Sequence, residues 1–182
     1  MSTTKKNILK VKPIIRTHVL AEIVIFIALG TALSIATRFM VFPQGGSITV
    51  GAMVPILWLS LRRGPKIGIF TGVIYGLVQL AIDPMVVYPT QVLLDYPLAY
   101  GCLGFAGFFK NLPVGGVVGA LMGRFVMHLF SGAIFFANLT PGGMSPWIYS
   151  ALYNGSYMLP ELVISICFIY LLQKSKVLGV YM

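Results

Sequence analysis

Three polar side chains interrupt apolar stretches of this sequence and could act together on one ligand. Asp95 is the one carboxylate in "QVLLDYPLAYG" (91–101), and His128 and Asn154 lie in two later apolar stretches. Ionisable groups in such surroundings are costly and are typical of functional sites. An acid, an imidazole and an amide suit a ligand that carries positive charge or several hydrogen-bond donors. Asp95 and His128 could alternatively form the acid–base pair of an intramembrane enzyme.

The composition indicates the kind of protein in which these groups lie. Of the 182 residues, 58% are hydrophobic and only 9% are charged, and the mean hydropathy is +0.91. In soluble domains about a quarter of all residues are charged, far more than in this chain. We therefore expect an integral membrane protein made of one compact unit. The net charge of +9 comes from basic residues at the ends of apolar stretches. That placement suits a lipid bilayer and argues against a nucleic-acid-binding face.

Cofactor and metal chemistry are not indicated. Cys102 and Cys167 lie inside apolar stretches without metal-ligand spacing, so we interpret them as packing residues. The sequence contains no P-loop, dinucleotide fingerprint or HExxH motif. We therefore expect no cofactor, no metal and no nucleotide hydrolysis by this chain itself.

Six apolar stretches, separated by breaks rich in glycine and proline, must position the polar groups. They predict an all-α membrane protein, a bundle of six transmembrane helices. We assign a basic leader to 1–17, the substrate-binding helical domain to 18–173 and a short tail to 174–182. The second stretch contains Pro55, which is typical of a short or broken helix beside a cavity. The predicted helices span 18–38, 48–61, 66–82, 91–109, 113–136 and 149–172.

The basic residues predict how the bundle is oriented. If the helices alternate in direction, 11 of the 13 lysines and arginines lie on one side of the membrane, and Arg38 is the exception near the other side. The positive-inside rule then predicts that both termini lie in the cytoplasm. We expect the protein to lie in the cell membrane. The 11 residues are Lys5, Lys6, Lys10, Lys12, Arg16, Arg62, Arg63, Lys66, Lys110, Lys174 and Lys176.

This topology brings the polar groups into the outer half of the membrane. From the predicted outer helix ends, Asp95 lies ~6 Å deep, His128 ~12 Å and Asn154 ~7 Å, at ~1.5 Å per residue. We therefore expect an outward-facing, aromatic-rich pocket. Residues at its mouth and in the outer loops are expected to complete it: Phe42, Gln44, Tyr88, Trp147 and Tyr149.

Each of these residues also has a structural interpretation. Asp95 could be an acid in a first helical turn, favoured by the helix dipole, and His128 could pack beside Arg124 on one helix face. Asn154 could bridge two helices, and the aromatic residues could be ordinary interfacial side chains. Glu161, deeper in the last helix, fits a structural or a functional role equally well. Their convergence favours a binding site.

Four segments resemble a known family. They are "GGSITVGAMVPILWLSLRRGPKIGIFTGVIYGLVQ" (45–79), "YPTQVLLDYPLAYG" (88–101), "GRFVMHLFSGAIFF" (123–136) and "SPWIYSALYNGSYMLPE" (145–161). Together they resemble the thiamine-specific S-component of energy-coupling factor transporters, over most of residues 20–170. The resemblance implies a six-helix membrane protein that captures thiamine outside the cell. It also implies partners, namely a transmembrane scaffold subunit and two ATPase subunits.

The resemblance implies a role for each residue of the pocket. The family's acid, which hydrogen-bonds the aminopyrimidine, falls on Asp95, and the tyrosine that follows it falls on Tyr96. The histidine that lies against the thiazolium falls on His128. The tyrosine and asparagine of the last helix fall on Tyr149 and Asn154.

The stacking residues depart from the family pattern, whereas a docking motif matches it. A tryptophan usually follows the histidine by eight positions, but this chain has Phe136, a weaker cation–π partner. Phe42 is the one aromatic candidate from the first outer loop, so an altered stacking cage is expected. The two alanines, four apart, that meet the scaffold subunit fall on Ala28 and Ala32.

Other functions remain open at this point. The protein could be an S-component for another vitamin, such as riboflavin, or for a thiamine precursor, although a neutral flavin needs no buried acid. An enzyme would turn over its bound substrate. A stand-alone channel or facilitator is disfavoured, because a pore needs polar residues through its full depth.

Overall fold

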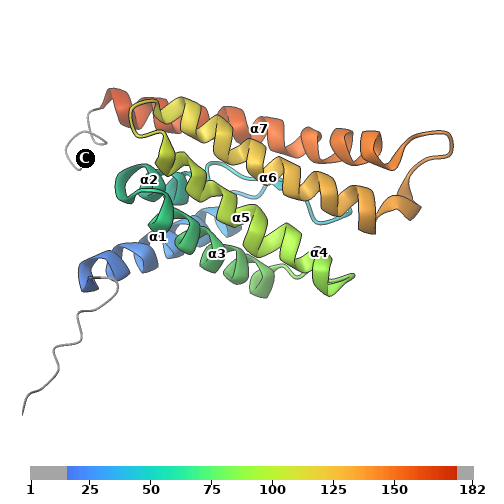
Figure 1. Ribbon diagram of the computed structural model, residues 1–182, viewed down its shortest axis with the longest axis horizontal. Coiled ribbons are helices and arrows are strands. Elements are labelled where there is room, and N and C mark those ends of the chain that lie inside the picture. The colour runs from blue at the N-terminus through green and yellow to red at the C-terminus, as the bar shows by residue number, and fades with distance from the viewer. Residues whose placement is uncertain (1–15, 176–182) are drawn as a thin grey trace, which may run out of the picture.

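The computed structural model describes residues 16–175, so the predicted leader up to residue 15 and the tail from 176 lie outside the described residues. The described chain is a bundle of helices with a small two-stranded hairpin (Figure 1). The hairpin pairs β1 (Met40–Val41) antiparallel to β2 (Ser47–Ile48). The helices are α1 (Thr17–Ala36), α2 (Val54–Arg63), α3 (Pro65–Ile82), α4 (Pro89–Leu93), α5 (Ala99–Gly101), α6 (Pro113–Phe135) and α7 (Pro146–Lys174).

Four of these helices, α1, α3, α6 and α7, are long and apolar enough to cross a membrane. This is a multi-pass helical membrane protein. The four spans agree with the prediction to within two residues at each end, except that α7 begins at Pro146 rather than at 149. Proline in the first turn marks the start of α3, α6 and α7, because its missing N–H would have no partner there in any case.

The second predicted helix was too long at its start. Residues 48–53 are not helical, because β2 pairs with β1 and the chain then turns at Gly51, whose φ of 79° favours glycine. Pro55 lies in the first turn of α2, so it starts this ten-residue helix and does not break it.

The fourth predicted helix, 91–109, is not one continuous α-helix. After α4 the chain forms a five-residue π-helical turn, η1 (Leu94–Leu98), then α5, then the 3₁₀ segment η2 (Cys102–Phe108). Pro97 lies inside η1. Proline has no N–H to donate and its ring clashes with the carbonyl four residues earlier, which accounts for the widened turn.

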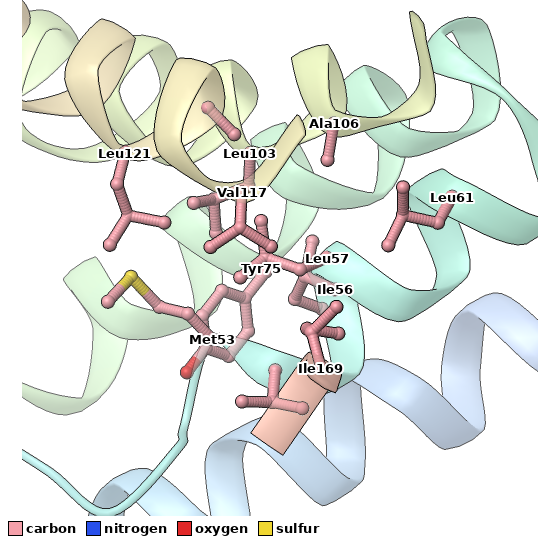
Figure 2. Close-up of a cluster of buried hydrophobic side chains, with 12 residues drawn as sticks. Met53, Ile56, Leu57, Leu61, Tyr75, Leu103, Ala106, Val117, Leu121 and Ile169 are labelled. Carbon is pink, nitrogen blue, oxygen red and sulfur yellow. The ribbon is translucent and has the colours of Figure 1, made fainter. Parts of the chain in front are cut away.

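The core packs this irregular segment between straight helices. Figure 2 shows Leu103 and Ala106 of η2 in contact range of side chains from α2, α3, α6 and α7 in one buried cluster. On α3, a Cβ at Gly76 would meet the carbonyl oxygen of Tyr96 at 2.5 Å. This close backbone approach, which only glycine allows, holds η1 against α3.

Candidate functional site

A cavity of about 950 Å³, including its open mouth, lies among α1, the hairpin, α3, η1, α6 and α7. Six of the predicted site residues line it: Gln44, Asp95, Tyr96, His128, Phe136 and Asn154.

Asp95 is the centre of a hydrogen-bond network. Its Oδ1 lies 2.9 Å from Nδ1 of His128. Its Oδ2 accepts hydrogen bonds from Oγ of Ser131 at 2.8 Å and from Nε2 of Gln91 at 2.6 Å. The π-helical turn and α6 thus bring together an acid and an imidazole that are 33 positions apart in the sequence. The three contacts hold the Asp95 carboxylate in one orientation.

The tautomer of His128 follows from its second neighbour. Nε of Arg124, one turn earlier on α6, donates to Nε2 of His128 at 3.2 Å. A guanidinium can only donate, so Nε2 accepts and the proton is on Nδ1, where it points to Asp95. Arg124 is further held by Met53, which its Nη1 contacts, and by the Tyr100 ring, whose centroid is 4.1 Å from Cζ. His128 is therefore a neutral, oriented side chain.

Asn154 connects α7 to α6 at the same level. Its Nδ2 donates to the carbonyl of Ser150 at 2.9 Å and to that of His128 at 3.3 Å. Its Oδ1 accepts from the Tyr157 hydroxyl at 2.6 Å. The helix-bridging interpretation of Asn154 therefore holds, and the residue also lines the cavity.

The predicted aromatic residues are divided between the cavity wall and the layer behind it. Phe136 is buried and lines the cavity. Phe42 packs behind the wall, against the rings of Tyr153 and Tyr157, at centroid distances of 5.9 and 5.6 Å. The Tyr149 hydroxyl accepts a hydrogen bond from Nε2 of the cavity residue Gln44 at 2.8 Å.

Besides Phe42 and Tyr149, two further predicted pocket residues do not line the cavity. Trp147 is 47% exposed and packs edge-on against Phe130, at a centroid distance of 5.4 Å. Tyr88 is also exposed and lies against Phe135. Exposed aromatic rings at helix ends suit the membrane interface, which was their structural interpretation.

Sequence reasoning missed several cavity residues. Tyr153 and Tyr157 line the wall of the cavity. They follow Tyr149 by four and eight residues on one helix, and this spacing was the available signal. Gln91 precedes Asp95 by four residues and Ser131 follows His128 by three. These spacings also place the side chains on shared helical faces.

The charged groups around the cavity do not balance. Three carboxylates line it, Asp83, Asp95 and Glu161, against the two guanidinium groups of Arg38 and Arg124. Arg38 and Asp83 pair with each other at 2.7 Å. The cavity thus has one carboxyl group more than it has guanidinium groups, and a monovalent cation suits such a site.

The predicted docking residues lie far from this wall. Ala28 and Ala32 are exposed on α1, whereas Gly30 between them is buried. A Cβ at Gly30 would meet the Ala52 carbonyl oxygen at 2.9 Å. The alanine pair therefore faces away from the bundle.

Comparison with known proteins places the chain in a family. The family model described as thiamine transporter protein matches residues 20–178. Thiamine transporter ThiT of Bacillus subtilis (strain 168) is 38% identical over 163 residues, covering 80% of this chain and 84% of that protein. ThiT of Lacticaseibacillus paracasei (strain ATCC 334) is 26% identical over 134 residues, 63% of this chain and 67% of that protein.

A solved structure supports the fold. ThiT from Listeria monocytogenes superposes with a TM-score of 0.77 at 23% identity, over 87% of this chain and 94% of that one. A likeness at this identity concerns the fold alone. The family model and the Bacillus relative, which extend over most of the sequence, establish that the chain belongs to the thiamine transporter family.

Proposed function

We propose that this protein captures thiamine from outside the cell with high affinity, as the substrate-binding subunit of an energy-coupling factor transporter. Membership of the thiamine transporter family supports thiamine uptake through the membrane, and it excludes the enzyme alternative, because this is a family of transporters. Beyond thiamine uptake, we propose that capture occurs from the outside, that the affinity is high, and that an energy-coupling module drives uptake.

The observation that carries the proposal is the oriented Asp95 carboxylate in a cavity lined by more carboxyl groups than guanidinium groups. Thiamine has a permanent cation, an aromatic pyrimidine and an exocyclic amine. We assign the aminopyrimidine to Asp95, whose carboxylate retains acceptor capacity for the amine. We assign the thiazolium to the space between His128 and Phe136, since an aromatic face attracts a cation.

The remaining predicted residues take supporting roles. Tyr96 holds the loop beside the cavity, because its hydroxyl donates to the Asp83 carbonyl at 2.7 Å and accepts from the Met85 N–H at 2.8 Å. Tyr149 and Phe42 brace the wall from behind. Tyr88 and Trp147 stay candidate contacts at the mouth.

The energy for uptake has to come from partners. The sequence contains no nucleotide-binding motif, so we propose docking on a transmembrane scaffold subunit with two ATPases through Ala28 and Ala32. We further propose six membrane crossings in the cell membrane, in which α2 and the α4–η2 segment are the two beyond the four long helices, with both termini in the cytoplasm. The charge distribution supports this orientation.

Two measurements test the proposal. Mass spectrometry of small molecules released from the detergent-purified protein should detect thiamine, and titration calorimetry should show saturable, one-to-one thiamine binding. An S-component for another vitamin is the second candidate; release of a flavin or of a thiamine precursor, with no thiamine binding, would support it instead.

A further inference from the structure

Glu161 is a second buried acid of the cavity, and only half of its carboxylate has hydrogen-bond partners. The side chain lies on α7, lines the cavity and is 4% exposed. Its Oε1 accepts hydrogen bonds from the backbone N–H and from Oγ1 of Thr49, the latter at 2.7 Å. Its Oε2 is buried and has no partner within residues 16–175. A buried carboxylate oxygen requires a donor. Because Oε2 has almost no accessible surface, a ligand in the cavity supplies that donor only after the Glu161 carboxylate has turned toward the cavity that its side chain lines.

Glu161 lies at a different depth from Asp95. The hydrogen bond from Asn154 to the His128 carbonyl fixes Asn154 at the level of the Asp95–His128 pair. Seven residues separate Asn154 from Glu161 along α7, which is ~10 Å. The two acids therefore stand apart along one cavity, and Arg124 lies on α6 between their levels.

We propose that Oε2 of Glu161 accepts a hydrogen bond from the thiamine hydroxyl while Asp95 holds the aminopyrimidine. This inference rests on the proposed function. Thiamine carries donors at its two ends, the pyrimidine amine and the hydroxyl of the ethyl chain on the thiazolium. If Asp95 takes the first, the unpartnered acid ~10 Å away is in position for the second.

The same contact selects the free alcohol. A phosphate ester at that end would place a second negative charge beside a buried carboxylate, which is strongly unfavourable. Arg124 keeps its positive charge, because its neighbours His128, Met53 and the Tyr100 ring are uncharged, so it offsets part of this repulsion. The contribution of Glu161 itself is to weaken the binding of the phosphate esters relative to thiamine.

Calorimetry on the detergent-purified full chain tests this with two ligands. One is thiamine and the other is the analogue with ethyl in place of hydroxyethyl. A hydrogen bond to a charged group corresponds to roughly a 10- to 100-fold change in affinity, so the wild type should bind the analogue weaker by that factor. Glu161→Gln keeps an Oε1 for Thr49 but removes the charged acceptor. It should lose about 10-fold or more for thiamine and bind the analogue as the wild type does.

Thr49→Val is the matched control, because it removes one partner of Oε1 and leaves Oε2 intact. Thr49→Val should keep the wild-type ratio between the affinities for thiamine and for the ethyl analogue. The preference of the wild type for thiamine over thiamine monophosphate should shrink only in Glu161→Gln. Equal weakening of both ligands in Glu161→Gln would mean that Glu161 acts only through Thr49 and would overturn the inference. Equal affinity of the wild type for both ligands would overturn it without any variant. A wild type that binds neither ligand would instead overturn the proposed function itself, and this inference with it.

Discussion

Asp95 supplies the charge of the site and also fixes its geometry. Three donors, from Gln91, His128 and Ser131, converge on its two oxygens. Asp95→Asn keeps the shape but turns one acceptor into a donor that faces other donors. We expect thiamine affinity to fall by about 2–5 kcal/mol, as when one side of a buried charged pair is removed. Titration calorimetry measures this loss.

Ser131→Ala tests how much the orientation of the Asp95 carboxylate contributes to binding, apart from its charge. It removes one hydrogen bond and leaves the carboxylate, so the loss should be smaller, about 1–2 kcal/mol. Thiamine binding to Asp95→Asn at wild-type strength would show that the acid only holds helices together and that the ligand lies elsewhere.

Phe136 should contribute through its ring face. Phe136→Leu preserves apolar volume but removes the π-system, and we expect thiamine affinity to fall by about 0.5–2 kcal/mol. Phe130→Leu is the control, because Phe130 packs against Trp147 and does not line the cavity. If both variants weaken binding equally, Phe136 does not contact the cation.

At this scale the sequence predicted that Asp95, His128 and Asn154 share one pocket, because depth along helices follows from simple counting. The counted depths of ~6 Å for Asp95 and ~12 Å for His128 did not predict their direct contact. The sequence also did not predict that the Asn154 amide would hydrogen-bond to Ser150, His128 and Tyr157. Such partners depend on how each helix is rotated about its axis. For the same reason Trp147 and Tyr88 were expected in the cavity wall but lie outside it. Aromatic residues at a helix end serve the interface and a pocket equally well in sequence.

At the scale of elements, the site depends on the irregular η1 turn and on the helix that supports it. Gly76 of α3 faces the carbonyl oxygen of Tyr96, next to Asp95. Gly76→Ala would push η1 away, and overpacking of this kind costs about 1–3 kcal/mol. We expect a lower thermal unfolding temperature together with weaker thiamine binding.

The control is Gly155→Ala on α7, where an added Cβ meets no atom within 4 Å. Alanine is a better helix former than glycine by up to about 1 kcal/mol, so this variant should be as stable as the wild type or more so. A Gly76→Ala protein with unchanged unfolding and binding would contradict the role of this close approach.

The straight elements were predictable and the irregular ones were not. Long apolar runs with first-turn prolines fixed α3 and α6 almost to the residue. The π-helical turn could not be read from the sequence, because Pro97 is compatible with a kink, a break or a bulge, and packing against α3 decides among them. The hairpin was equally hidden, since two-residue strands carry no periodic signal.

At the scale of the whole molecule, the basic residues near the α2–α3 junction and the cavity lie at opposite ends of the bundle. α1 begins and α7 ends at the same end (Figure 1), where Arg62, Arg63 and Lys66 also lie beside the α2–α3 junction. Glu22 of α1 pairs there with Arg63. Arg38, the predicted exception, pairs with Asp83 at the cavity. This arrangement supports the proposed orientation, in which the cavity faces outward.

Capture and coupling should be separable, because the cavity and the Ala28/Ala32 stripe are on different faces of the molecule. Both alanines are exposed, and no cavity residue lies beside them on α1 except Ser34, which faces inward. Small residues four apart let another helix approach closely in lipid. We expect Ala28→Leu with Ala32→Leu to leave thiamine binding by the isolated protein nearly intact. The same pair should abolish co-purification with the scaffold and ATPase subunits, and with it thiamine uptake by cells.

A pull-down beside a binding titration on one preparation provides the measurement, and Ser156→Leu is the control. Ser156 is exposed on α7, so this change also adds a leucine to an outer face. It should preserve both binding and assembly, because bulk alone on a lipid-facing surface is tolerated. Loss of assembly in both variants would indicate general crowding in the membrane. Assembly that survives in the double alanine variant would move the docking surface off α1, since two leucines would fill the groove that a partner helix needs.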